Sequence, residues 1–393
     1  MTPHRRLITS AAASAIALSF VSDAFADVSA EAVLESVQRQ FAVQGVEINV
    51  DSAELRGGDD VLLSGVSFAG PGDDKGVKLD QVLLEDVAEG PNGAFIIGRV
   101  AAPAFTTEQD GFTFAFEGGS IEGYYLAGPD ETDPVLKGGV YRAIQVGGFA
   151  VSKGSNTVFT LEGAQASMSP YEPGGTMDYD MEIKDFTVDF TQVDDPKTSA
   201  AMAELGYSKL TGRMTGDGSW NAASGDLSMD NAVVIDEAAT LNIGLAIGGY
   251  TMELMDGLQK LNVEMQNQSD EAMGLAMLGL AQQVQIGNVT IEIVDDSATG
   301  RILDFVAKQQ GTNRESIIAQ AKGALPFALG QLQNPEFAAS VAAAVSAFLE
   351  DPGSLKVAAA PANPVPVAQI VGAVMTAPQS LIGVLGVTVT ANE

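Results

Sequence analysis

The sequence predicts an α+β fold: a long, twisted antiparallel sheet, shaped as a trough or half-barrel, with a C-terminal helical segment packed on its apolar face. Apolar and polar residues alternate with period two through much of residues 27–296. Turns rich in Gly and Asp separate these segments. From about Asp296 the apolar spacing becomes helical. We therefore expect a β-rich domain at 27–296 and a mainly helical segment at 297–393.

The first 26 residues resemble a secretory signal peptide. Arg5 and Arg6 precede an uncharged apolar segment at residues 7–21, and Ala24 and Ala26 form an A-x-A cleavage site. The apolar segment is shorter than the roughly 20 residues that a membrane span needs. We predict cleavage after Ala26, export to the periplasm of a Gram-negative envelope, and no transmembrane segment afterwards. General secretion and twin-arginine export both stay open.

The mature chain begins with a short amphipathic helix, expected at residues 30–43. Strands are expected at 61–68, 77–87, 94–103, 112–116, 141–152, 158–168, 177–190, 241–249 and 285–294. Within 177–190 the apolar residues switch from odd to even positions after Ile183. A β-bulge near Lys184 and Asp185 would keep them on one face of the sheet.

The segment "TGDGSWNAASGDLSMDN" (residues 215–231) contains acidic residues, glycines and the only Trp of the chain. A calcium loop starting at Asp217 would need Gly at position 222 and Glu at position 228, which are Ala and Ser. The apolar residues on either side alternate with period two, and Asn, Ser and Gly between them favour a turn. We therefore predict a hairpin with Trp220 at its end.

The C-terminal segment has clear helix boundaries. Asn334 precedes Pro335 and Glu336 as an N-cap, and Asp351-Pro352-Gly353 ends the same helix. The apolar residues 337–349 are too few to span a bilayer. Residues 387–391 are expected to return to the sheet as a strand.

The composition excludes most catalytic chemistry. The chain has no Cys, and its single histidine, His4, lies in the predicted signal peptide. Ser-His-Asp, Cys-His and zinc sites therefore cannot be built in the mature chain. The formal net charge of −31 repels nucleic acids. We predict a protein that is not an enzyme and has no cofactor, metal or nucleic-acid partner, with a carboxylate-only glycoside hydrolase as an alternative.

The segments "LGYSKLTGRMTGDGSWNAASGDLSMDN" and "LNIGLAIGGY", together with the tail from "FLEDPGSL" to "GVTVTANE", resemble an uncharacterised proteobacterial envelope family, a domain of unknown function. This family distantly resembles AsmA-type envelope proteins. That resemblance implies a long sheet forming an apolar trough. The chain differs from the AsmA pattern because it keeps no membrane anchor.

These observations predict an exported envelope protein that holds a lipid or acyl chain in an apolar groove. The expected lining consists of large flexible or aromatic residues from two strands: Phe112, Phe114, Phe116, Met177, Tyr179 and Met181. The same side chains could instead form a closed core between the sheet and the helices. A structural or protein-interaction module that uses the sheet surface or edge is a further alternative, with another envelope protein as partner.

Overall fold

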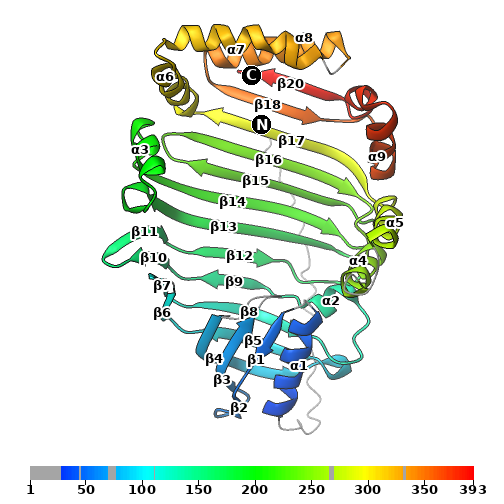
Figure 1. Cartoon of the computed structure of the whole chain (residues 1–393). Coiled ribbons are helices and arrows are strands. Elements are labelled where there is room, and N and C mark those ends of the chain that lie inside the picture. The colour runs from blue at the N-terminus through cyan, green and yellow to red at the C-terminus, as the bar shows by residue number, and fades with distance from the viewer. Residues whose placement is uncertain (1–27, 44–45, 70–76, 110, 265–269, 331–332) are drawn as a thin grey trace, which may run out of the picture.

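The computed structural model describes residues 28–43, 46–69, 77–109, 111–264, 270–330 and 333–393. The predicted signal peptide, with its cleavage site at Ala24 and Ala26, lies outside the described residues. In the described part the chain forms one open sheet of twenty strands, and all strand pairs are antiparallel (Figure 1). The predicted α+β fold class is confirmed.

The main path across the sheet begins where two short strands pair with β3 and ends at β20. In spatial order it contains β1 (Glu47–Asn49) and β2 (Ser52–Leu55), β3 (Val61–Ala69), β4 (Val77–Glu89), β5 (Phe95–Ala102), β8 (Gly119–Leu126), β9 (Ala143–Val146), β12 (Ala164–Met168), β13 (Thr176–Asp189), β14 (Lys209–Asn221), β15 (Leu227–Ile235), β16 (Ala239–Gly248), β17 (Gln285–Asp295), β18 (Ser354–Ala359) and β20 (Val387–Ala391).

A branch of four strands joins this path at one half of β13. It runs through β6 (Phe105–Gln109), β7 (Phe112–Phe116), β10 (Phe149–Lys153) and β11 (Asn156–Leu161), while β19 (Val365–Pro366) pairs with the end of β17. The branch corrects two predictions, because 141–152 and 158–168 each form two strands. Gly147-Gly148 and Gly163 separate them, so that β9 and β12 continue the main path while β10 and β11 leave it.

Most helices lie at the ends of the strands, but α1 lies over the first strands of the sheet, and α7 and α8 lie along its last strand, β20 (Figure 1). Their bounds are α1 (Ala30–Val43), α2 (Pro134–Gly138), α3 (Pro196–Glu204), α4 (Met252–Glu264), α5 (Asp270–Ala281), α6 (Ala298–Gln310), α7 (Arg314–Leu329), α8 (Pro335–Glu350), α9 (Val367–Thr376) and α10 (Leu381–Val384), with 3-10 turns at Pro91–Gly93, Phe190–Gln192 and Pro378–Ser380. Helix α1 has the predicted bounds, whereas α3, α4 and α5 were not predicted.

The C-terminal helices pack against the last strands of the sheet, with α8 in contact with β20 and β18. The predicted N-cap is confirmed, because the Asn334 side chain accepts a hydrogen bond from the backbone N–H of Phe337 at 3.0 Å. Strand β20 confirms the expected return of the chain at residues 387–391. The C-terminal segment therefore supplies both helices and the strands that extend the sheet.

Both local predictions for the middle of the sheet are confirmed. Between Ile183, which pairs with Met214, and Phe186, which pairs with Gly212, the bulge places Lys184 and Asp185 opposite a single residue. Strands β14 and β15 form the predicted hairpin, with Trp220 paired with Leu227 at its end. The Trp220 side chain is 7% exposed and donates to the backbone oxygen of Tyr250 at 2.7 Å.

The largest group of buried apolar residues lies where α1 covers the first strands. Val33 of α1, Val61 of β3, Ile97 of β5 and Leu126 of β8 are all 0% exposed. The amphipathic stripe of α1 therefore meets strands that are up to about 90 residues away in sequence. This packing creates the cavity described next.

Candidate functional site

A cavity of about 500 Å³ lies between α1 and the face of the sheet formed by β3, β4, β5, β8 and β9. Val37 and Phe41 of α1 form part of its wall, and the strands supply apolar residues such as Leu84, Val100 and Ile121. Ligand pockets in proteins usually measure about 300–1,000 Å³ and are mostly apolar. The cavity has both properties.

The two ends of helix α1 pack differently. Val33, near its start, is 0% exposed and belongs to the closed core. Phe41, near its end, lines the cavity and stacks at a tilt on Phe68 of β3, with ring centroids 5.6 Å apart. Phe41 and Phe68 therefore form an aromatic part of the cavity wall.

None of the described residues that line the cavity is charged. Its polar side chains are Ser120, Tyr124, Tyr141 and Gln145. Ser120 and Gln145 pair across β8 and β9 next to the pair of Ile121 and Ile144. Because successive strand residues face opposite sides of a sheet, Ser120 and Gln145 point away from the isoleucines that line the cavity. Tyr124 and Tyr141 therefore supply its polar groups.

Tyr124 reaches the cavity because of a local backbone irregularity that period-two reasoning does not foresee. Strict alternation along β8 would place Gly123 and Tyr125 on the face of Ile121. Gly123 has a φ of 61°, a left-handed conformation that glycine adopts without strain, and Tyr124 instead pairs with Ile97. Burial raises the pKa of the Tyr124 hydroxyl to about 12.

The apolar face continues beyond the cavity across the whole sheet. Strand pairing connects one lateral row of residues from β4 to β20, namely Leu84, Val100, Ile121, Ile144, Ala166, Met181, Gly216, Asn231, Ile243, Ile291, Val357 and Val389. In the later part of this row Ile243, Ile291 and Val357 are 37%, 45% and 41% exposed. One apolar face is thus covered at the α1 end and open between β16 and β18.

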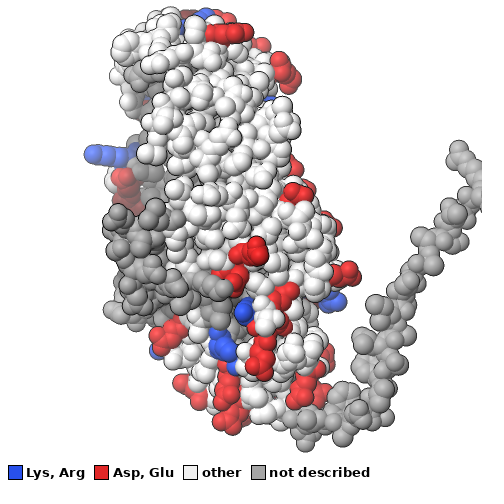
Figure 2. Space-filling model, turned by 90° about the vertical axis from the view of Figure 1, so that its right-hand side faces the viewer, with Lys and Arg blue, Asp and Glu red and all other residues white. Residues whose placement is uncertain are grey.

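The flank of the sheet that carries α9 also has little charge. Figure 2 shows this side, where charged side chains gather in the lower part of the molecule and the upper part is largely uncharged. The sequence from Val357 to Asn392 has no Asp, Glu, Lys or Arg. Val374 and Met375 of α9 are 56% and 80% exposed. Exposed apolar side chains therefore occur both on the open face and on this flank.

The six residues predicted to line a groove share one face of the sheet but lie in two groups outside the cavity. Phe112, Phe114 and Phe116 are on the branch strand β7, where the rings of Phe114 and Phe149 are 6.4 Å apart. Met177, Tyr179 and Met181 are on β13, opposite Trp220, Gly218 and Gly216 of β14. All six are partly buried.

The glycines of β14 explain how Tyr179 and Met181 lie. A Cβ atom at Gly218 would clash with the Tyr179 ring and with the backbone oxygen of Ser228. A Cβ at Gly216 would come 3.2 Å from Cγ of Met181. The side chains of β13 therefore lie across β14, and the glycines in "TGDGSW" make room for them.

Glu131 is the one buried carboxylate among the described residues, at 8% exposed. Its Oε1 atom accepts the backbone N–H groups of Thr132 and Asp133 at 2.8 and 2.9 Å, and Oε2 accepts the Tyr125 hydroxyl at 2.9 Å. The backbone hydrogen bond from Asp133 is the main reason why its pKa is lowered. An ionised carboxylate with both oxygens engaged is unsuited to donate a proton.

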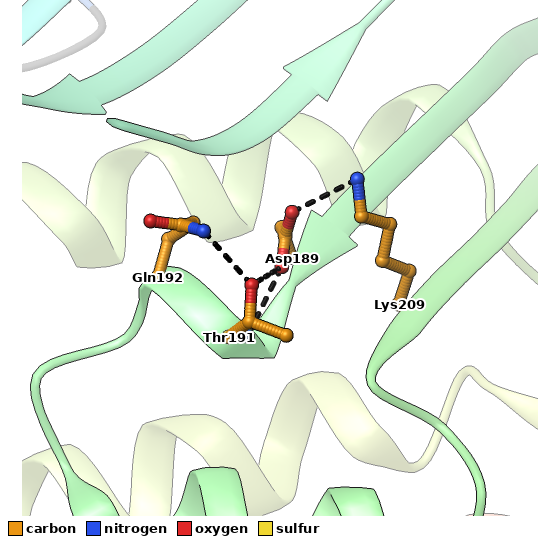
Figure 3. Close-up of polar contacts among 4 residues, drawn as sticks. All are labelled: Asp189, Thr191, Gln192 and Lys209. Carbon is orange, nitrogen blue, oxygen red and sulfur yellow. Dashed lines mark hydrogen bonds and ion pairs between the residues drawn. The ribbon is translucent and has the colours of Figure 1, made fainter. Parts of the chain in front are cut away.

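A second polar cluster surrounds Asp189 at the end of β13 (Figure 3). Asp189 accepts the backbone N–H of Thr191 at 3.0 Å and the Thr191 hydroxyl at 2.5 Å, and it pairs with Lys209 Nζ at 3.0 Å. The Thr191 hydroxyl is the main cause of a lowered Asp189 pKa. The cluster contains a single carboxylate, and the described residues contain no group of three or more potential metal ligands. It stabilises the turn after β13.

Comparison with known proteins adds a family match over part of the chain. A family model described as an uncharacterised protein matches residues 232–392, from within β15 to the end of the sheet. No curated protein matches the chain. The cavity lies outside the matched residues, whereas the exposed apolar residues of β16 to β18 lie inside them. Among the helices that the structure describes, none is long and apolar enough to cross a membrane.

Proposed function

We propose that this protein is an exported, non-catalytic component of the bacterial envelope that holds a lipid acyl chain against the apolar face of its sheet. The observation that carries the proposal is the cavity of about 500 Å³ between α1 and the sheet, whose described lining has no charged residue. An acyl chain needs an apolar wall and no charged partner, and the cavity supplies both.

The size of the cavity argues against a closed core as its explanation. Protein interiors contain few voids larger than a water molecule. A space of about 500 Å³ is far larger than such voids, and its lining is mostly apolar. An apolar occupant would remove this apolar surface from water.

Three further features are consistent with a lipid in the envelope. The N-terminal signal pattern with Ala24 and Ala26 favours export, and cell fractionation can test the periplasmic location directly. The row that continues from the cavity to β20 is apolar except at Asn231, which agrees with the long apolar trough implied by the distant AsmA resemblance. The engaged carboxylate of Glu131 favours the non-catalytic proposal over a glycoside hydrolase.

A protein-interaction role is the second candidate, and a different observation favours it. Ile243, Ile291 and Val357 are adjacent across β16, β17 and β18 and remain exposed. Exposed apolar surface of this kind is a feature of protein-binding sheets. A second envelope protein would be the partner in this case.

Native mass spectrometry of protein purified from the periplasm tests the lipid proposal. We expect a bound mass that organic extraction identifies as a lipid, and we expect the extracted protein to bind a fluorescent acyl probe. Phe114→Asp is the matched control, because Phe114 lies on the same face but outside the cavity, and it should keep the bound mass. Protein that carries no lipid and binds no acyl probe would overturn the proposal.

A further inference from the structure

Two helices on the uncharged flank of the sheet are apolar on all sides. The polar residues of α9 are Gln369 and Thr376, and no polar residue follows Glu271 in α5. The two helices contact each other, although they are far apart in the sequence. A helix that is apolar all round is normally buried, either in a protein core or in lipid.

The apolar side chains of these helices are nevertheless exposed. Val371, Val374 and Met375 of α9 are 38%, 56% and 80% exposed. Their spacing of i, i+3 and i+4 places them on one side of the helix. On α5, Met277 and Leu278 are 51% and 40% exposed. Both helices lie at the same ends of the strands, so that their exposed side chains share one flank of the molecule (Figure 1).

The composition of this flank favours a lipid bilayer over a protein as the surface that covers it. Protein interfaces concentrate aromatic residues and Arg at their centre and surround them with a polar rim. Neither α5 nor the segment 357–392 contains an aromatic residue, Lys or Arg. Insertion into the boundary between headgroups and acyl chains scales with the apolar area that is buried. The flank supplies apolar area without the anchors of a protein interface.

The distribution of charge defines how the molecule can approach a bilayer. The formal net charge of −31 repels anionic headgroups from most of the surface. The segment 357–392 has no charged residue, and the charged side chains on this side of the molecule gather in its lower part (Figure 2). The flank can therefore meet a bilayer without dehydrating a charge, but it offers no cation to anionic lipids.

We propose that α5 and α9 form a membrane-docking surface, which inserts Met277, Val374 and Met375 into the interfacial region of a bilayer with neutral headgroups. Both helices lie on the bilayer, since neither is long and apolar enough to cross it. Helix α9 follows β19, which pairs with the start of β17, so docking brings this end of the open apolar face to the bilayer. The inference is independent of the proposed acyl site, whose lining lies under α1.

Flotation of the mature protein with phosphatidylcholine vesicles tests this surface. We expect binding that high salt leaves unchanged and that added phosphatidylglycerol weakens. Met375→Glu and Met277→Glu should each weaken binding by about ten-fold, because each replaces an inserted apolar side chain by a charge. Ile302→Glu is the matched control and should bind like the wild type. Ile302 is 50% exposed and lies on α6, which follows the other end of β17.

A fluorescent label gives a second readout that does not depend on the Glu variants. The chain contains no Cys, so Met375→Cys provides a single site for an environment-sensitive fluorophore. Its emission should shift to the blue when vesicles are added, whereas the emission of labelled Ile302→Cys should not change. A label at position 375 that does not respond, equal vesicle binding by all three Glu variants, or binding that high salt abolishes would overturn the proposal.

Two further measurements separate this surface from its alternatives. Self-association of the protein that Met375→Glu abolishes, without vesicle binding, would assign the flank to a second copy of the chain and overturn membrane docking. Met375→Glu should bind the fluorescent acyl probe like the wild type, because Met375 is not part of the described cavity lining. Failure of the wild type to bind that probe would overturn the proposed acyl-binding function and leave the docking surface standing.

Discussion

The substitution Ile121→Trp tests whether the space under α1 is a ligand cavity or part of a packed core. Ile121 lines the cavity, so the larger indole can enter it. A Trp side chain buries about 150–250 Å². A gain of about 50 Å² over Ile, at about 25 cal/mol per Å², would stabilise the ligand-free protein by about 1 kcal/mol. The indole should also displace the acyl probe.

Leu126→Trp is the matched control for this experiment. Leu126 belongs to the same group of buried residues, is 0% exposed, and is not part of the described cavity lining. Overpacking a closed site costs about 1–3 kcal/mol. With a urea m-value near 3 kcal/mol/M, the two variants should differ by about 1 M in midpoint. Equal destabilisation of both variants, with probe binding retained by Ile121→Trp, would refute the assignment of the cavity.

Three further predictions concern stability and can be followed by circular dichroism during unfolding. Gly218→Ala should cost about 2 kcal/mol, because its Cβ would clash with the backbone oxygen of Ser228, and an unchanged midpoint would contradict this packing. Glu131→Ala should lower the free energy of unfolding by about 3 kcal/mol, because it leaves two N–H groups and a hydroxyl unpaired. The folded-state pKa of Glu131 is lowered, so the wild type should lose this stabilisation as the pH falls below about 4.5. Tyr124 and Tyr125 have folded-state pKa values raised to about 12. Their contribution to the free energy of unfolding should therefore be complete below pH 10 and lost between pH 10 and 12. Tyr124→Phe should make this loss smaller.

Much of the sheet could be predicted from local sequence because its strands alternate cleanly. The switch in apolar phase at Lys184 and Asp185 was sufficient to locate a bulge, since only an extra residue keeps both halves of β13 on one face. The turn after Trp220 could be recognised from its composition, and the Asn221 side chain accepts the N–H groups of Ala223 and Ser224 there. These features depend on neighbours within a few residues.

The candidate cavity depends instead on contacts between distant segments. The sequence shows the amphipathic stripe of α1, but its spacing does not indicate which strands the helix covers. Phe41 meets Phe68 only in the folded chain. Tyr124 was missed for a local reason. Period-two alternation selects Tyr125, and the left-handed backbone at Gly123 reverses the choice. A glycine inside a strand pattern was the available signal.

The open end of the apolar face distinguishes the two candidate functions, and Ile291→Asp is the variant that separates them. Ile291 lies between Ile243 and Val357 and is 45% exposed, so an aspartate there can remain hydrated and should change the free energy of unfolding by less than about 1 kcal/mol. If acyl chains extend from the cavity across the sheet, the charge should lower the lipid mass per protein in native mass spectrometry while the probe still enters the cavity. Val37→Asp, at the α1 wall, should show the opposite pattern, with loss of probe binding. An unchanged lipid mass in Ile291→Asp, accompanied by loss of a wild-type complex in size-exclusion chromatography, would assign the open face to a protein partner.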